Sequence, residues 1–407
     1  MTRSMIGMAL LCVCAPWTWA EPLSADDPRI KAFETGLIDR MQRGNPGTQR
    51  WTIEQRLENY RVPGVAVAIL DGGEIVWAKG YGVTLAGSDD AVDADTVFSV
   101  GSVSKMINAA LILRLVAEGR LDLDKDVNEY LTSWQVPESR YSRQEKVTLR
   151  RILSHTAGFT VHGFADYEPD EALPTALQTL NGQRPAKNDR VELMFAPGDR
   201  MDYSGGGITV SQVLVEDVTG LAYEDAARKY VFEPLGMARS TFANPLPVEH
   251  GNIARAHDDR GRPAGLPRGW EAMPELAASG LWTSANDLGA FVIGLLDDGF
   301  LPPGVLEDMM NREERSWYGL GPRLNGNGPS RVFHHGGANN SYRAWIEGHP
   351  DSGAGIVVVT NGTDGHWIHA EVRKSAEDAF GWPVKSDGGF EEPDFQAAFV
   401  RPYRQAR

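Results

Sequence analysis

Strand-forming residues gather near the two ends of this chain and leave a long middle that favours helices. Residues 65–70 and 74–79 are two apolar, β-rich runs around a Gly-containing turn, which predicts a β-hairpin. Further strand signals lie at residues 277–283, 342–347 and 355–361. We therefore expect an α/β (α+β) fold, in which N- and C-terminal segments form one antiparallel β-sheet flanked by helices, with a mostly helical inserted subdomain.

Helical patterns set the expected boundaries of that insert. Residues 106–118 carry apolar side chains at helical spacing until Gly119 stops the pattern, and Pro and Gly divide residues 122–244 into short helix-leaning segments. The sequence also predicts helices over the segments 27–41, 52–60 and 368–380. We expect one domain over residues 21–407, with about 100–260 as the helical subdomain and about 21–99 with 261–407 as the α/β subdomain. Their junction is a favoured place for a site.

Residues 1–20 have the pattern of a secretory signal peptide. Arg3 precedes a short apolar run, and the small residue Ala20 stands at the expected cleavage point. No later stretch approaches the ~20 apolar residues that a membrane helix needs. We expect a periplasmic or secreted protein with no integral membrane segment after cleavage. The only cysteines, Cys12 and Cys14, lie in this segment, so we expect no disulfide and no cysteine-ligated metal afterwards.

Charge and composition narrow the partners further. The chain has 40 Lys and Arg against 55 Asp and Glu, a formal net charge of −15, which disfavours nucleic acid and anionic membranes. Gly205 to Gly207 lacks the lysine and hydroxyl of a phosphate loop. His366 and His369 have helical spacing, but two such histidines without a carboxylate are typical of solvated side chains. We expect no metal and no organic cofactor.

The chemistry-bearing motif is Ser102-Val103-Ser104-Lys105, at the start of the helical pattern over residues 106–118. Residues three apart on a helix share a face, so the Ser102 hydroxyl and the Lys105 amine can meet. A serine needs a base to become a nucleophile, and a lysine with a lowered pKa can serve. An isolated motif of this kind is more often an N-cap serine with a solvated lysine, but no other lysine in the chain has a serine three residues before it.

Further segments accompany this motif in a fixed order. The chain resembles the serine β-lactamase and penicillin-binding-protein superfamily, in particular its class C-like branch with D,D-carboxypeptidases, D-aminopeptidases and family VIII carboxylesterases. The matching segments are residues 62–65, 98–105, 119–124, 148–158, 195–198, 203–205, 234–237, 279–283 and 335–337. The resemblance implies that Ser102 is the acylated nucleophile and Lys105 its activating partner. It also implies a structural helix end and turn at residues 154–158.

The second and third motifs of the superfamily have their counterparts here. Tyr203 matches the tyrosine that relays protons, whereas Gly205 stands where asparagine is usual, which removes an amide that would bind a substrate's acyl amide. His335-Gly336-Gly337 matches the histidine form of the third motif. The resemblance implies that the N–H groups of Ser102 and Ala338 hold the oxyanion, with Gly336 and Gly337 admitting the substrate. His334 and His335 face opposite sides of the predicted strand, and the motif selects His335 for the pocket.

These residues predict a hydrolase that cleaves ester or amide bonds of small-molecule or peptide substrates through an acyl-enzyme on Ser102. An esterase-like specificity is favoured, because Gly205 offers no side chain and His335 is expected to be only partly charged near neutral pH. The alternatives are a D-stereospecific peptidase or D,D-carboxypeptidase, and a weak β-lactamase. A non-catalytic binding relative is a further alternative, and the joint presence of Ser102, Lys105 and Tyr203 argues against it. Ser284 with Asp287 predicts a capping box. The oligomeric state is left open by the sequence.

Overall fold

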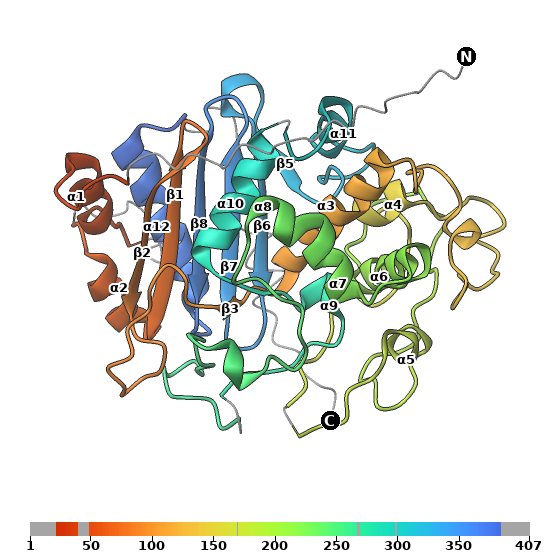
Figure 1. Cartoon of the computed structure of the whole chain (residues 1–407), viewed down its shortest axis with the longest axis horizontal. Helices are drawn as coiled ribbons and strands as arrows, with labels where there is room; N and C mark the ends of the chain where they lie inside the picture. Colours follow the sequence, from red (N-terminus) through yellow and green to blue (C-terminus); the bar gives the residue numbers. More distant parts are fainter. Residues whose placement is uncertain (1–21, 40–48, 169, 267–268, 298, 384–407) are drawn as a thin grey trace, which may run out of the picture.

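A computed structural model describes residues 22–39, 49–168, 170–266, 269–297 and 299–383 (Figure 1). The expected signal peptide, with Cys12 and Cys14, lies outside the described residues, as does the end of the helix expected over residues 27–41. Over the described ranges, no helix is both long enough and apolar enough to cross a bilayer.

One six-stranded sheet forms the centre of the protein, in the order β2-β1-β8-β7-β6-β5, and every neighbouring pair is antiparallel. The N-terminal hairpin joins the C-terminal strands through β1 and β8, whose register runs from Val65 opposite Thr360 to Leu70 opposite Gly355. The predicted sheet made from both ends of the chain is therefore confirmed. Its strands are β1 (Gly64–Asp71), β2 (Glu74–Gly82), β5 (Arg323–Asn325), β6 (Val332–Ala338), β7 (Arg343–His349) and β8 (Ala354–Thr360).

Helices cover both faces of the sheet, which explains why β1 is apolar at consecutive positions rather than at alternate ones. Its odd residues Val65, Val67 and Ile69 share a core with α1 (Pro28–Thr35), α2 (Ile53–Tyr60) and α12 (Gly365–Phe380). Its even residues Ala66, Ala68 and Leu70 belong to a second core with α10 (Ala285–Leu296). In Figure 1, α10 crosses in front of the sheet and α12 lies behind it.

The N-terminal and C-terminal helices are tied together by buried charge. Arg56 of α2 is 2% exposed and donates from Nε and Nη2 to the Glu371 carboxylate of α12, at 2.7 and 2.8 Å. The Tyr60 hydroxyl donates to the same carboxylate at 2.6 Å. Thr52 caps α2, and Gln55 closes the capping box. These contacts hold two segments that are about 300 residues apart in sequence on one face of the sheet.

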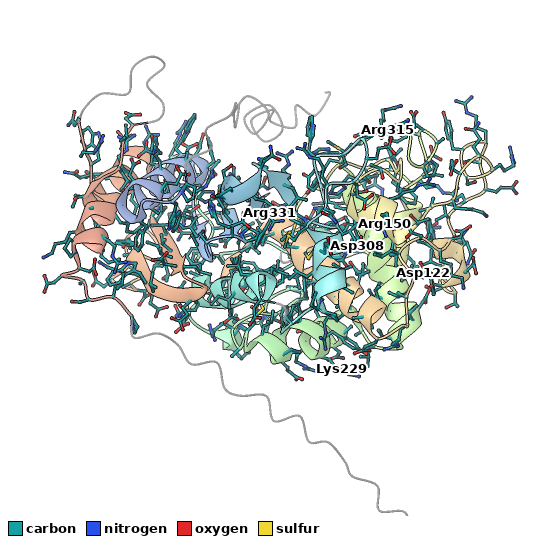
Figure 2. The ribbon with its side chains drawn as sticks, turned by 90° about the horizontal axis from the view of Figure 1, so that it is seen from above. Asp122, Arg150, Lys229, Asp308, Arg315 and Arg331 are labelled. Atoms are coloured by element: carbon teal, nitrogen blue, oxygen red, sulfur yellow. The ribbon has the colours of Figure 1, made fainter. Side chains whose placement is uncertain are left out.

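The remaining helices pack mostly beside the sheet, where α3, α4, α6 and α7 lie together in Figure 1. Arg150 of α4 binds Asp308 of α11 at 3.3 Å and Glu313 at 2.9 Å (Figure 2). The α-helices are α3 (Ser104–Ala117), α4 (Leu149–Leu153), α5 (Ala176–Asn181), α6 (Gly205–Thr219), α7 (Tyr223–Ala227), α8 (Glu233–Leu235), α9 (Leu276–Ser279) and α11 (Pro303–Met309). The 3₁₀ turns are η1 (Gly101–Val103), η2 (Val127–Glu129), η4 (Val248–His250) and η5 (Gly328–Ser330), and η3 (Arg228–Phe232) is a π-helical turn.

Several predicted elements differ in extent. The strand expected over 277–283 is mostly wrong: α9 occupies its first part, where the Ala277 amide donates to Gln212 Oε1 of α6. Only β4 (Trp282–Thr283) is extended, and it pairs with β3 (Phe98–Ser99) rather than with the main sheet. The first helix ends at Thr35, and α12 begins at Gly365, before its predicted start.

The predicted capping box at Ser284 is half correct. The Ser284 hydroxyl accepts from the Asp287 amide and caps α10, but the Asp287 carboxylate turns to the Ser240 hydroxyl at 2.7 Å and the Arg239 amide at 2.8 Å. A tertiary contact therefore replaces the local one. The division into subdomains at about residues 100 and 260 stays a prediction.

Candidate active site

Ser102 and Lys105 meet at the start of α3. Ser102 lies in the turn η1, which leads into the helix, and the Lys105 ammonium donates to the Ser102 hydroxyl at 3.1 Å. Ser102 is partly exposed, whereas Lys105 is 2% exposed. The three-residue spacing thus brings a reachable hydroxyl and a buried amine into contact.

Burial controls the charge of Lys105. Removal from water lowers the pKa of its ammonium from the usual 10.5 to about 7. Its second partner is the carbonyl oxygen of Ala278 in α9, at 2.7 Å, which accepts a hydrogen bond but adds no negative charge. A substantial part of the protein therefore carries a neutral amine beside Ser102 at neutral pH.

Tyr203 stands next to this pair, just before α6. The Lys105 nitrogen lies 5.0 Å from the centre of the Tyr203 ring. Burial, followed by the neighbouring Tyr318, raises the pKa of the Tyr203 phenol, and the nearby Ser102 partly offsets this rise. No hydrogen bond of normal geometry joins the two hydroxyls, and the buried phenol oxygen has no partner within the described part of the chain. Tyr203 is thus a neutral phenol with a free hydrogen-bonding position beside Ser102.

Two histidines pack against Tyr203, and the sequence patterns singled out neither of them as a site residue. The His155 ring lies 4.3 Å from the Tyr203 ring, and the His162 ring lies 4.9 Å from it. Burial first, then the charge of Lys105, lowers the pKa of both. The segment after α4 is the predicted helix end and turn, with His155 at a positive φ of 60°. The local sequence contains no signal that this turn also packs the His155 imidazole against the Tyr203 ring.

His335 and His334 point to opposite sides of β6, as predicted. His334 stacks on Trp345, with ring centres 4.8 Å apart, whereas His335 lies 6.1 Å from Tyr318. His335 is buried, and burial followed by the charge of Lys105 lowers its pKa to about 3. The expectation that this ring is partly charged near neutral pH is therefore wrong, because that expectation used the pKa of a solvated histidine.

The hydrogen bonds of His335 define its tautomer. Its Nδ1 lies 2.7 Å from the Gly336 carbonyl oxygen, so a neutral ring carries its proton there. Its Nε2 is buried and meets no hydrogen-bonding group among the described residues. The third motif therefore offers an acceptor nitrogen where a lysine would offer a cation.

The end of β6 packs directly against the turn that carries Ser102. A Cβ atom at Gly337 would lie 1.9 Å from the Val100 carbonyl oxygen and 3.1 Å from the Ser102 nitrogen. From the other side, a Cβ atom at Gly101, whose φ is +49°, would lie 2.8 Å from the Ala338 nitrogen. Only glycine permits this approach at either position. It brings the backbone amide groups of Ser102 and Ala338 onto facing segments.

Gly205 is the first residue of α6, and its surroundings explain why no side chain stands there. A Cβ atom would lie 2.9 Å from the Phe164 ring and 3.2 Å from the His162 carbonyl oxygen. The segment 162–164 thus fills the space that an asparagine at this position would need.

The remaining histidine pair does not resemble a metal site. His369 is 4% exposed, so its predicted solvation is wrong, and burial holds its pKa well below the usual value. Across the described residues there is no group of three or more His, Cys, Asp or Glu side chains arranged to hold a metal ion.

The structure combines an antiparallel sheet built from both chain ends with a serine and a lysine paired at the start of α3. This is the arrangement of the β-lactamase and transpeptidase fold. The family profile described as Beta-lactamase matches residues 50–379. The chain belongs to this family.

Individual relatives are more distant. The chain is 29% identical over 274 residues to a beta-lactamase of Lysobacter lactamgenus, covering 66% of this chain and 65% of the relative. It is 30% identical over 252 residues to penicillin-binding protein 4 of Amycolatopsis lactamdurans, covering 60% and 62%. The chain thus spans less than two thirds of the length of these curated relatives. A solved octameric penicillin-binding protein homologue from Pyrococcus abyssi shares the fold, with a TM-score of 0.66, 24% identity and coverage of 80% and 75%.

The contact between β6 and η1 predicts a strong effect of a single methyl group. Gly337→Ala forces the strand away from the turn, since its Cβ overlaps the Val100 carbonyl. We expect the rate at which a fluorophosphonate labels Ser102 to fall by about tenfold or more in a protein that still unfolds cooperatively. Gly304→Ala in α11 is the matched control, because its Cβ meets no atom within 4 Å and it lies outside the site. Wild-type labelling of Gly337→Ala would contradict this account of the contact.

Proposed function

We propose that this protein is a serine hydrolase that cleaves ester or amide bonds of small molecules or peptides through an acyl-enzyme on Ser102. The observation that carries this proposal is the 3.1 Å contact between the Ser102 hydroxyl and a buried lysine whose pKa is near 7. A neutral amine beside a partly exposed hydroxyl is the pairing that activates a serine without a histidine. It also disfavours a non-catalytic binding role, for which a desolvated lysine would be a cost without use.

In the first half-reaction the Ser102 oxygen bonds to the substrate carbonyl carbon while Lys105 accepts the hydroxyl proton. The amide N–H groups of Ser102 and Ala338 donate to the negative oxygen of the tetrahedral intermediate. The carbonyl then re-forms and the bond to the leaving group breaks. Lys105, with Tyr203 as relay, returns the proton to the departing oxygen or nitrogen. Water next attacks the acyl carbon while the same groups take its proton. The bond between the acyl carbon and the Ser102 oxygen then breaks, the proton returns to that oxygen, and the carboxylic acid leaves.

The Tyr203 phenol suits the relay role, since it stays protonated and its oxygen has room for another hydrogen bond. Gly336 would let the substrate lie against β6 without a side chain in the way, whereas Gly337 admits the Val100 carbonyl of the turn that carries Ser102. His335 contributes a neutral acceptor rather than a charge, and Gly205 contributes no side chain, since Phe164 and the His162 carbonyl occupy the place where one would stand. Neither metal nor organic cofactor is needed for these steps.

Among substrates, carboxylic esters suit these residues best. A β-lactam or a D,D-peptide presents a carboxylate that a cationic third motif attracts and an acyl amide that the second-motif asparagine binds. Here His335 is neutral and the place of that asparagine is filled by Phe164 and His162. The alternatives of a D-stereospecific peptidase or D,D-carboxypeptidase and of a weak β-lactamase draw on relatives named beta-lactamase and penicillin-binding protein. Export to the periplasm or medium belongs to the same proposal and rests on residues 1–20.

Replacement of the paired residues tests the nucleophile. Ser102→Ala removes the attacking oxygen, so we expect no turnover and no fluorophosphonate labelling. Lys105→Ala removes the base and should lower kcat by about 10²-fold or more. Mass spectrometry of the labelled protein identifies the modified residue, and Ser142→Ala, in a loop outside the site, serves as the control. Labelling that persists in Ser102→Ala would refute the assignment.

The pH dependence tests the lysine. Only neutral Lys105 accepts a proton, and burial lowers its pKa to about 7. We therefore expect kcat/KM to rise with pH below that value, by about tenfold per unit well below it, and to level off above it. Initial rates on a neutral ester across this range, corrected for spontaneous hydrolysis, give the profile. A flat profile through neutral pH would mean that another group takes the proton.

The substrate preference is tested with chromogenic compounds. We expect measurable hydrolysis of short-chain p-nitrophenyl esters and slow or negligible hydrolysis of penicillins and cephalosporins. The loss of one hydrogen bond and one charge contact costs about 1 to 3 kcal/mol each, or about tenfold to a hundredfold per contact. Nitrocefin turnover that exceeds that of p-nitrophenyl acetate and butyrate in kcat/KM would overturn this ranking.

A further inference from the structure

Two segments that the proposed reaction needs side by side meet at two glycines. The end of β6 supplies the Ala338 amide, and the segment from β3 to η1 supplies the Ser102 amide. A Cβ atom at Gly337 or at Gly101 would overlap the facing segment, so glycine allows the two backbones to touch. The same glycines have no side chain that could fix how far apart the two amide groups lie.

One hydrogen bond joins these two segments. The side-chain amide of Asn339, the residue after Ala338, donates to the hydroxyl of Ser99, which lies three residues before Ser102, at 2.6 Å. Between residues 336–340 and 98–103, all of which the structure describes, it is the one hydrogen bond present. In the described chain β6 pairs with β5 and β7, whereas β3 pairs with β4. The spacing of the two amides therefore depends on packing and on this one side chain.

Both partners of this hydrogen bond are themselves held in place. The Asn339 backbone N–H donates to the Tyr342 carbonyl oxygen at 3.2 Å, and Arg343 Nη1 donates to the Asn339 carbonyl oxygen at 2.5 Å. On the other side, Ser99 is 3% exposed and pairs with Trp282 of β4. Because the bond connects two ordered segments, it transmits the position of the β6–β7 turn to the segment that carries η1.

The stabilisation of an oxyanion is sensitive to small displacements at this junction. Two N–H groups stabilise the developing negative charge only when each lies about 2.7–3.1 Å from the same oxygen. A displacement of about 1 Å can lower a rate by about 10²-fold. Asn339 is bonded directly to Ala338, so a shift of its side chain away from Ser99 moves one of the two donors. Its effect on the reaction therefore passes through the Ala338 amide.

We propose that Asn339 is a positioning residue, whose hydrogen bond to Ser99 sets the distance between the Ser102 and Ala338 amide groups that hold the oxyanion. This inference rests on the proposed function, because the oxyanion forms only when a substrate reacts with Ser102. It places a residue of the β6–β7 turn, outside all three sequence motifs, among those on which the reaction rate depends.

A matched pair of oxygen and sulfur esters tests this role. In p-nitrophenyl thionobutyrate a sulfur replaces the carbonyl oxygen of p-nitrophenyl butyrate, and sulfur is a weak hydrogen-bond acceptor. Each kcat/KM is divided by the rate constant of the same ester with hydroxide, which removes the difference in intrinsic reactivity. In wild-type protein we expect this normalised value to favour the oxygen ester by about tenfold or more, because only its oxyanion accepts strong hydrogen bonds.

Variants locate the effect. In Asn339→Ala the ratio between the two esters should fall by about fivefold or more, mainly because the oxygen ester is cleaved more slowly. Ser99→Ala breaks the same hydrogen bond from the other side and should have the same effect, and the double variant should add little. Asn340→Ala is the matched control, because it lies in the same turn and its side chain is exposed. It should keep the wild-type ratio.

The outcomes separate the positioning role from the hydrolase activity. Thermal unfolding shows that each variant is folded, and either Asn339→Ala or Ser99→Ala decides the question if the other does not fold. An equal loss on both esters, an unchanged ratio, or a wild-type ratio near one would overturn the positioning role and leave the serine hydrolase intact. Wild-type protein that cleaves neither ester and does not react with a fluorophosphonate at Ser102 would overturn both.

Discussion

The antiparallel pairing of β1 with β8 is the contact on which the rest of the structure depends. It joins the N-terminal hairpin to strands formed nearly 300 residues later, so β7 and β6 can follow in order across the sheet. The last residues of β6 then meet the turn that carries Ser102. Because two glycines permit that approach, the end of β6 forms one side of the site, and the other side is helical.

Desolvation sets the chemistry at that junction. Lys105 is buried without a carboxylate among its hydrogen-bond partners, and its pKa falls to about 7 as a result. The imidazoles of His155 and His335 are buried near it, and the lysine's charge lowers their pKa further. The site therefore holds two neutral imidazoles and a lysine that is partly neutral near pH 7, which suits proton transfer more than the binding of an anionic substrate.

Local patterns in the sequence determined the hairpin, the helix that begins near Ser102, the pairing of Ser102 with Lys105 and the opposite orientations of His334 and His335. These features depend on residues that are close to one another in the sequence, where helix, strand and turn geometry leave few alternatives. Only the tertiary structure decided that residues 277–279 are helical, that His155 packs on Tyr203 and that Phe164 fills the space at Gly205. It also decided the neutral state of His335. Each of these results depends on burial by segments distant in sequence, and a pKa or a helix changes with surroundings that no local pattern encodes.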